Sequence, residues 1–186
     1  MNPISSILGV FAVLGTWPNW ERYFDLSRKG LKASFAVLAL SAAPLWLIVY
    51  GTQAERARSL EEAIVLPGIL PFILIVGIWL FSFPMLAYLI GMILEKMDRV
   101  RPWIVTRNWA VFGFSILTGA VFGLTALGLL PFVAANGVLF AAYLGLLAAD
   151  IRIAQKVAGF NWGTAILIGC VIVAVSLTFV QLTISR

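Results

Sequence analysis

The chain has 186 residues, of which 62% are hydrophobic and 11% are charged, and its net charge is +5. Soluble domains average about 45–50% apolar and about 25% charged residues, so this composition excludes a water-soluble fold. The Lys and Arg residues occur in short clusters beside apolar runs, not as a basic stripe with interleaved aromatic residues, which argues against a nucleic-acid partner. We therefore predict one integral membrane domain that covers residues 1–186.

The N-terminal segment 1–17 predicts a short helix. Apolar residues recur from Ile4 to Leu14 at the i, i+3, i+4 spacing of a helix face, and a proline follows at position 18. The run is short for a membrane crossing, which needs roughly 20 apolar residues. We interpret residues 1–17 as a helix that lies in the membrane interface, with a short re-entrant helix as the alternative.

Longer apolar runs predict five transmembrane helices in an all-α bundle. The clearest run covers residues 108–149 and contains no charged residue. This run is about twice as long as one crossing needs, so we expect a helical hairpin. Its turn is expected near residues 131–137, where Pro131, Asn136 and Gly137 interrupt the helical pattern. The predicted crossings are residues 33–51, 66–94, 109–130, 138–153 and 163–183.

The distribution of Lys and Arg predicts the orientation. With five crossings, ten of the 13 basic residues fall on one side, in the clusters 22–32, 96–107 and 152–156. The positive-inside rule then places the N-terminus in the cytoplasm and the C-terminus outside. Five tryptophans near these clusters are expected at the cytoplasmic boundary of the membrane, namely Trp17, Trp20, Trp103, Trp109 and Trp162.

The cytoplasmic clusters are the best candidates for an interaction surface. Each exposed Lys or Arg near an anionic membrane surface contributes about 1 kcal/mol of attraction, so these residues could hold a protein partner or a lipid headgroup. The candidate residues are Arg28, Lys29, Arg99, Arg101 and Arg107. Two acids at the same boundary, Asp98 and Asp150, are eligible for ion pairs with Arg101, Arg107 or Arg152.

Small residues at four-residue spacing predict close helix packing in the hairpin. Gly119 and Gly123 continue a line from Ser115, and Gly145 lies between Ala141 and Ala149. Small residues in line let two helix backbones approach closely in lipid. We interpret the two lines as packing on each other within the hairpin, and a homo-oligomer interface is the alternative.

The residue types available argue against catalysis. The chain has no histidine and one cysteine, so the commonest general base and the commonest transition-metal ligand are both missing. We predict no metal, no cofactor and no enzymatic activity. An enzyme that acts on lipids at the cytoplasmic face would have only Asp98, Asp150 and the nearby arginines to work with.

Two stretches of the chain resemble a known family. Residues 23–35 (YFDLSRKGLKASF) and 101–109 (RPWIVTRNW), together with the five crossings, resemble small five-span bacterial inner-membrane proteins that are distantly similar to the Yip family of Rab/Ypt-interacting membrane proteins. The resemblance implies a bacterial inner-membrane location, a cytoplasmic N-terminus, an opposite-side C-terminus and a membrane-organising role. It assigns no functional residue.

Two functional hypotheses follow. The first is a non-enzymatic accessory or membrane-organising protein that acts through contacts with lipid or with other membrane proteins. The second is a small transporter or channel, alone or as an oligomer, because Pro84 breaks the second crossing and irregular backbone in membranes often lines a path.

Overall fold

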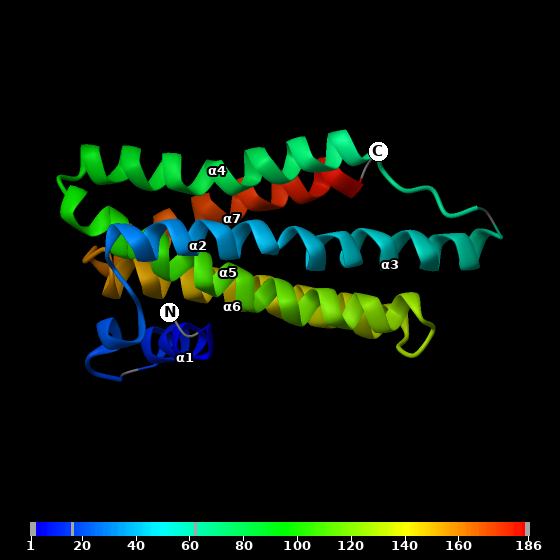
Figure 1. Cartoon of the computed structure of the whole chain (residues 1–186), viewed down its shortest axis with the longest axis horizontal. Helices are drawn as coiled ribbons and strands as arrows, with labels where there is room; N and C mark the ends of the chain where they lie inside the picture. Colours follow the sequence, from blue (N-terminus) through cyan, green and yellow to red (C-terminus); the bar gives the residue numbers. More distant parts are fainter. Residues whose placement is uncertain (1–2, 16, 62, 185–186) are drawn as a thin grey trace.

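The computed structural model describes residues 3–15, 17–61 and 63–184, and it shows a bundle of helices that run along one long axis. A short N-terminal helix and a 3-10 turn lie at one end of the bundle (Figure 1). In chain order the elements are α1 (Pro3–Leu14), η1 (Trp20–Tyr23), α2 (Arg28–Leu40), α3 (Ala42–Leu60), α4 (Ile69–Ile93), α5 (Met97–Ala126), α6 (Phe132–Lys156) and α7 (Trp162–Ile184).

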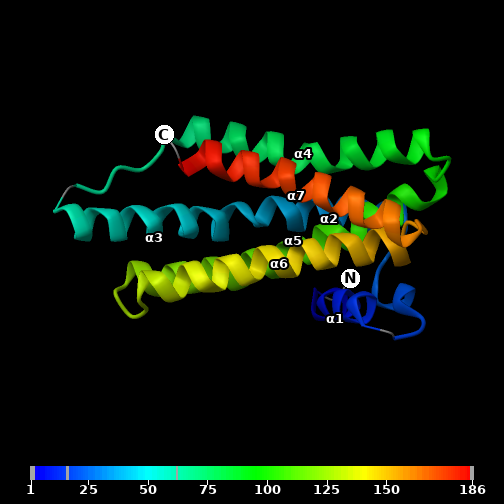
Figure 2. The same cartoon turned by 180° about the vertical axis from the view of Figure 1, so that it is seen from behind.

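Four stretches of helix are long and apolar enough to cross a membrane. They are Arg28–Leu60, Ile69–Ile93, Met97–Ala126 and Phe132–Lys156. These four correspond to the first four crossings predicted from the sequence, and they confirm a helical, multi-pass membrane protein. The fifth predicted crossing falls on α7, which lies beside α4 and α6 (Figures 1 and 2). This helix is not one of the four, because its apolar stretch among the described residues, Trp162–Ser176, is shorter.

The first crossing is longer at both ends than predicted. Helices α2 and α3 follow each other almost without interruption, and together they cover 33 residues. The first of them begins where Ser27 accepts a hydrogen bond from the Gly30 amide at 3.3 Å, which is the usual N-cap arrangement. At 1.5 Å per residue the pair reaches about 50 Å, so its polar ends extend beyond a hydrocarbon core of about 30 Å.

Helix α5 is the hub of the fold. It packs against α2, α3, α4, α6 and the N-terminal helix, and its residues 103–111 are buried on every side. The charged segment 95–107, predicted as a connection between crossings, therefore needs correction, because most of it forms the first turns of α5. Charged residues lower the hydropathy of these turns without breaking the helix, so a hydropathy argument places its start too late.

The turn between α5 and α6 also differs from the prediction. It falls at residues 127–131, and Asn136 and Gly137 lie inside α6. Gly128 adopts the left-handed conformation with φ of 74°, and the amides of Gly128 and Leu129 donate to the carbonyls of Thr125 and Leu124, both at 2.9 Å. This is the Schellman pattern, which closes a helix with a glycine that tolerates positive φ.

Close packing at the hairpin glycines also differs from the prediction. A Cβ on Gly119 would overlap Pro44 of α3, and a Cβ on Gly51 of α3 would lie 2.5 Å from the Phe122 carbonyl oxygen of α5. Gly145 of α6 faces the ring of Phe114, at 2.9 Å from the position of an added Cβ. The two lines of small residues therefore do not face each other, and the glycines at 51 and 119 instead let α3 and α5 approach closely.

Gly123 follows the same pattern, since the nearest side chain to its added Cβ is that of Leu47 in α3, at 3.8 Å. Glycines at four-residue spacing indicate that another helix packs closely against that face. The spacing does not identify the other helix, which for Gly119 and Gly123 is α3.

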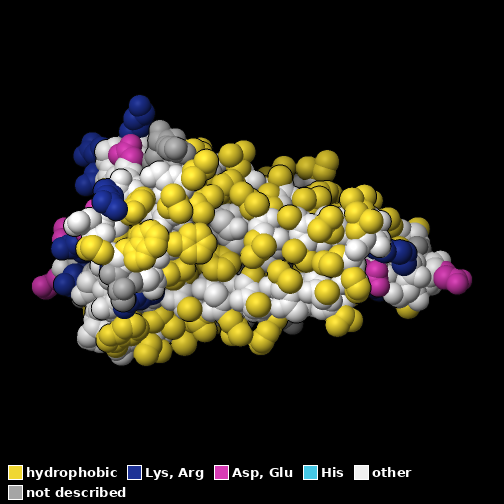
Figure 3. Space-filling view, turned by 90° about the horizontal axis from the view of Figure 1, so that it is seen from below, with side chains coloured by type: hydrophobic (Ala, Val, Ile, Leu, Met, Phe, Trp, Pro, Cys, Tyr) yellow, Lys and Arg dark blue, Asp and Glu magenta, His cyan; other side chains and the backbone are white. Residues whose placement is uncertain are grey.

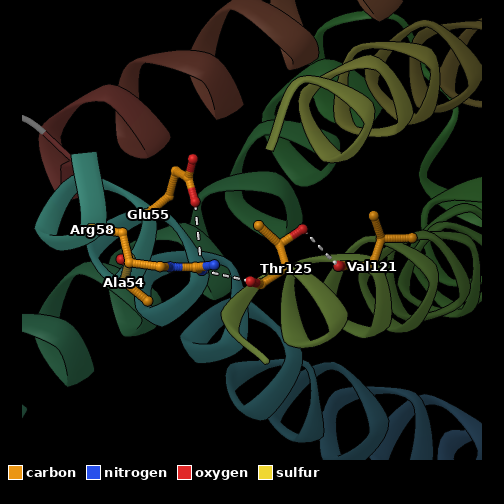
Figure 4. Close-up of polar contacts among 5 residues, drawn as sticks. All are labelled: Ala54, Glu55, Arg58, Val121 and Thr125. Carbon is orange, nitrogen blue, oxygen red and sulfur yellow. Dashed lines mark hydrogen bonds and ion pairs between the residues drawn. The ribbon is translucent and has the colours of Figure 1, made fainter. Parts of the chain in front are cut away.

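Arg58 joins α3 to α5 (Figure 4), at the end of the bundle opposite α1 (Figure 1). The Arg58 Nη2 atom donates to the Thr125 carbonyl at 2.6 Å, and its Nε atom donates to the Ala54 carbonyl at 3.2 Å. Glu55 lies 3.5 Å from the same guanidinium. Thr125 is in the last turn of α5, and its carbonyl accepts from Arg58 in addition to the Gly128 amide that closes the helix.

Candidate functional site

Charged side chains gather at the two ends of the bundle, and hydrophobic side chains cover the length between them (Figure 3). We call the end that carries α1, η1 and the connection between α6 and α7 the basic end. It collects the ten basic residues of the clusters 22–32, 96–107 and 152–156. Such segregation suits a membrane protein, because only the ends of the helices reach water.

Four of the five basic residues predicted as an interaction surface are exposed. Arg28, Lys29, Arg99 and Arg101 all have exposed side chains at the basic end. Arg99 makes an ion pair with Asp98 at 3.1 Å, with both side chains largely in solvent, so the pair contributes little to stability. For the other three, no salt bridge forms among the residues that the structure describes.

Arg107 needs correction, because it is buried and does not belong to the exposed surface. Its Nε atom donates to Asp150 Oδ1 at 2.7 Å and its Nη2 atom donates to Oδ2 at 3.3 Å. The two side chains are 4% and 0% exposed. Two parallel N–H···O bonds make a strong pair of fixed geometry, and it ties α5 to α6 in the interior of the bundle.

An aromatic ring covers the arginine of this ion pair, and a second ring packs against the first. The guanidinium carbon of Arg107 lies 4.1 Å from the centre of the Phe83 ring. The Trp103 ring packs edge-on against Phe83 and Phe160, with ring centres 5.5 and 5.4 Å apart. An arginine over a ring face gains cation–π attraction, and the gain is larger where water is excluded.

Only part of the set of tryptophans expected at the membrane boundary is exposed. Trp17 and Trp162 are exposed, at 49% and 53%. Trp103, Trp109 and Trp20 are buried, with 1%, 1% and 5% exposure. At the basic end these three rings form the core of the bundle, so they are shielded from both water and lipid.

The buried part of α5 also carries polar groups that its own helix does not satisfy. The Asn108 amide donates to Ser34 Oγ of α2 at 3.1 Å. Among the described residues, the Nε1 atoms of Trp103 and Trp109, Thr106 Oγ1 and Asn108 Oδ1 find no hydrogen-bond partner. Four of the six such buried side-chain atoms in the described part of the chain lie on this segment of α5.

A second polar junction, missed by the sequence analysis, holds α1. Lys156, the last residue of α6, donates to the carbonyls of Ala12, Gly15 and Trp17 at 3.1, 3.2 and 3.0 Å. Arg152, one turn earlier, lies over the Trp162 ring at 5.5 Å. A lysine in the last turn of a helix is a known C-cap signal, but the sequence does not show that it caps a different helix.

The largely apolar cavity inside the bundle has a volume of about 110 Å³. It is lined by residues from α3, α4, α5, α6 and α7, including Ile48, Val76 and Leu146. The hydroxyls of Ser115 and Thr118 border it but donate to carbonyls of their own helix. An apolar cavity of this kind does not hold water well.

Pro84 does not interrupt α4, which continues as one helix from Ile69 to Ile93. Near it, the Ser82 hydroxyl donates to the Trp79 carbonyl at 2.8 Å. Proline has no N–H, so one helix hydrogen bond is missing here, but the break in the crossing on which the transporter hypothesis depended is not present in α4.

The two candidate catalytic carboxylates have different surroundings. Asp98 is 72% exposed and pairs with Arg99, whereas Asp150 is fully buried and pairs with Arg107. Within the described part of the chain, no group of three or more His, Cys, Asp or Glu residues could hold a metal ion.

Comparison of the chain with family models, with curated proteins and with solved structures finds no match in any of the three. The functional evidence is therefore the geometry and the charge of this chain itself.

Proposed function

We propose that the chain is a non-enzymatic accessory or organising protein of a membrane, which acts through contacts made at its basic end. The observation that carries the proposal is the set of exposed cations there. Arg28, Lys29 and Arg101 have no salt-bridge partner among the described residues, although acids lie nearby in the sequence. A surface with uncompensated positive charge attracts an anionic partner, either an acidic protein surface or anionic lipid.

The membrane arrangement that we propose has five crossings, with α7 as the fifth. Its 23 residues reach about 35 Å at 1.5 Å per residue, which matches the hydrocarbon core. The excess of Lys and Arg at the basic end supports a cytoplasmic position for that end, and a C-terminus outside. A bacterial inner membrane and a membrane-organising role are what the resemblance to the Yip family implies, and we retain both as part of the proposal.

The test is purification from native membranes in mild detergent. We compare the wild-type protein with a variant that carries Arg28→Gln, Lys29→Gln, Arg99→Gln and Arg101→Gln. The matched control is Arg56→Gln, an exposed arginine at the opposite end of the bundle. We expect a stoichiometric partner or co-purifying anionic lipid that the fourfold variant loses and the control keeps. Equal recovery of the partner or of the lipid with all three proteins would contradict the proposal.

A small transporter is the second candidate, and one observation favours it. Charged residues inside membrane bundles often mark a substrate or ion path, and Arg107 with Asp150 is such a pair. Flux of protons or small ions into liposomes that contain the purified protein tests this function. A flux that Asp150→Asn abolishes would support the transporter, whereas the accessory function predicts no flux above that of empty liposomes.

A further inference from the structure

Helix α1 ends against α6, where a lysine side chain caps part of its C-terminal end. Lys156 has three N–H donors, and the three carbonyls that it contacts belong to the last turn of α1 and the residues just after it. The last carbonyls of a helix normally need water or a cap. The lysine satisfies the Ala12 carbonyl and two carbonyls beyond the helix from within the protein, which favours this end of α1 close to lipid, where unsatisfied carbonyls are costly. Figure 2 shows α1 beside the basic end of α6.

Arg152 lies at the same junction, and most of its N–H donors make no hydrogen bond with the described residues. It donates to Gln155 Oε1 at 3.0 Å and to the Gly15 carbonyl at 3.5 Å, and it lies over the Trp162 ring. A guanidinium has five N–H donors, so three remain available. Within the described residues no carboxylate forms a salt bridge with it. In that part of the chain, Arg152 is thus an oriented cation without an anion.

The surface around Arg152 combines charged groups with exposed apolar side chains, because Lys156 interacts electrostatically with both Arg152 and Glu21 at this junction. Trp162 and Trp17 are each about half exposed, and on the outer face of α1 Leu8 and Phe11 are 45% and 59% exposed. Exposed indole rings suit the headgroup level of a membrane, where one edge of the ring is wet. The partner that fits this surface carries an anion beside an apolar layer.

We propose that this junction binds one anionic phospholipid of the leaflet at the basic end. Arg152 holds the phosphate through its free N–H groups, since the planar guanidinium matches the geometry of a phosphate. Trp17 and Trp162 flank the headgroup, and the outer face of α1 rests on the acyl chains. This inference rests on the proposed membrane role. The lipid site is separate from the interaction surface formed by Arg28, Lys29, Arg99 and Arg101.

The test measures retention of phosphatidylglycerol against phosphatidylcholine with identical acyl chains, by native mass spectrometry of the purified full-length protein. We expect the wild type to prefer phosphatidylglycerol. Arg152→Gln should lower its affinity for this lipid about fivefold, the effect of one surface charge, and leave phosphatidylcholine unaffected. Arg152→Lys keeps the charge and should retain most of the preference. Thermal unfolding of each variant checks that the bundle remains folded.

The control is Arg56→Gln, which removes an exposed cation at the opposite end of the bundle and should leave the preference for phosphatidylglycerol nearly unchanged. An unchanged preference for phosphatidylglycerol in Arg152→Gln, or an equal loss of it in Arg56→Gln, would overturn the inference. So would crosslinking of Trp17→Cys to a stoichiometric protein in native membranes, because the junction would then be a protein interface. The fourfold variant used to test the proposed function keeps Arg152, so the two proposals can fail independently.

Discussion

Arg107 and Asp150 meet across the α5–α6 hairpin as a bidentate ion pair with a shortest distance of 2.7 Å, and they lie equally far along the chain from the bond between Gly128 and Leu129. The symmetry follows from the turn, because in a helical hairpin residues at equal distances from the turn lie opposite each other. Both groups are buried, and each one satisfies the charge of the other.

Removing one member of this pair should destabilise the protein severely. Arg107→Met leaves a carboxylate buried without a counterion, and we expect a loss of about 3–5 kcal/mol in the free energy of unfolding. Reversible denaturation of the purified protein in detergent measures this loss. Arg101→Met, which shortens an exposed arginine on the same helix, should change stability by less than about 0.5 kcal/mol.

The double variant Arg107→Met with Asp150→Leu tests whether the two side chains contribute to stability as a pair or independently. With both charges gone, no buried charge is left alone, so the double variant should be more stable than Arg107→Met by itself. If the two single losses simply add, the side chains act independently and the ion pair does not hold the hairpin.

Gly119 should not tolerate a larger side chain, because its Cα faces Pro44 of α3. We expect Gly119→Ala to lower the free energy of unfolding by about 1–3 kcal/mol through overpacking between α3 and α5. Gly113→Ala is the matched control on the same helix, since nothing lies within 4 Å of its added Cβ. If Gly119→Ala folded with normal stability but lost self-association, the glycine would belong to an interface between copies of the chain.

Arg58 should stabilise the end of the bundle opposite α1. Arg58→Gln removes the charged donor from the Thr125 carbonyl, and we expect a loss of about 1 kcal/mol, because the arginine is partly solvated. Hydrogen exchange of the amides near the α5–α6 turn should rise in this variant. In Arg56→Gln, which alters a nearby exposed arginine of α3 without a described contact, exchange should stay at the wild-type rate; an equal rise there would point to a general charge effect.

The crossings themselves could be predicted from the sequence because a membrane imposes a length of about 20 apolar residues. Helix α4 runs from Ile69 to Ile93, close to the predicted 66–94. The start of α5 at Met97 was missed, since Asp98, Arg99 and Arg101 lower the hydropathy of turns whose backbone is helical. Hydropathy detects the residues that must be apolar because they contact lipid, and we expect the first turns of α5 to lie outside the hydrocarbon core.

The ion pair could be predicted only as one of several combinations. Asp150 had three eligible arginines, and the choice among them depends on the position of the turn. A turn centred near residue 134, as the proline and Asn-Gly pattern suggested, would have placed Thr118 opposite Asp150. The glycine at 128 shifts the register and brings Arg107 there instead. Packing of Gly119 on α3 and capping of α1 by Lys156 are contacts between distant segments, which local pattern does not encode.

We propose that the basic end faces the cytoplasm and that the opposite end lies outside. Labelling of introduced cysteines in whole cells with a membrane-impermeant reagent, in a Cys170→Ser background, tests this orientation. We predict that Ser59→Cys and Leu129→Cys react from outside, that a cysteine appended after residue 186 also reacts, and that Lys29→Cys does not. Labelling of Lys29→Cys without Ser59→Cys would contradict the orientation and place the basic end outside.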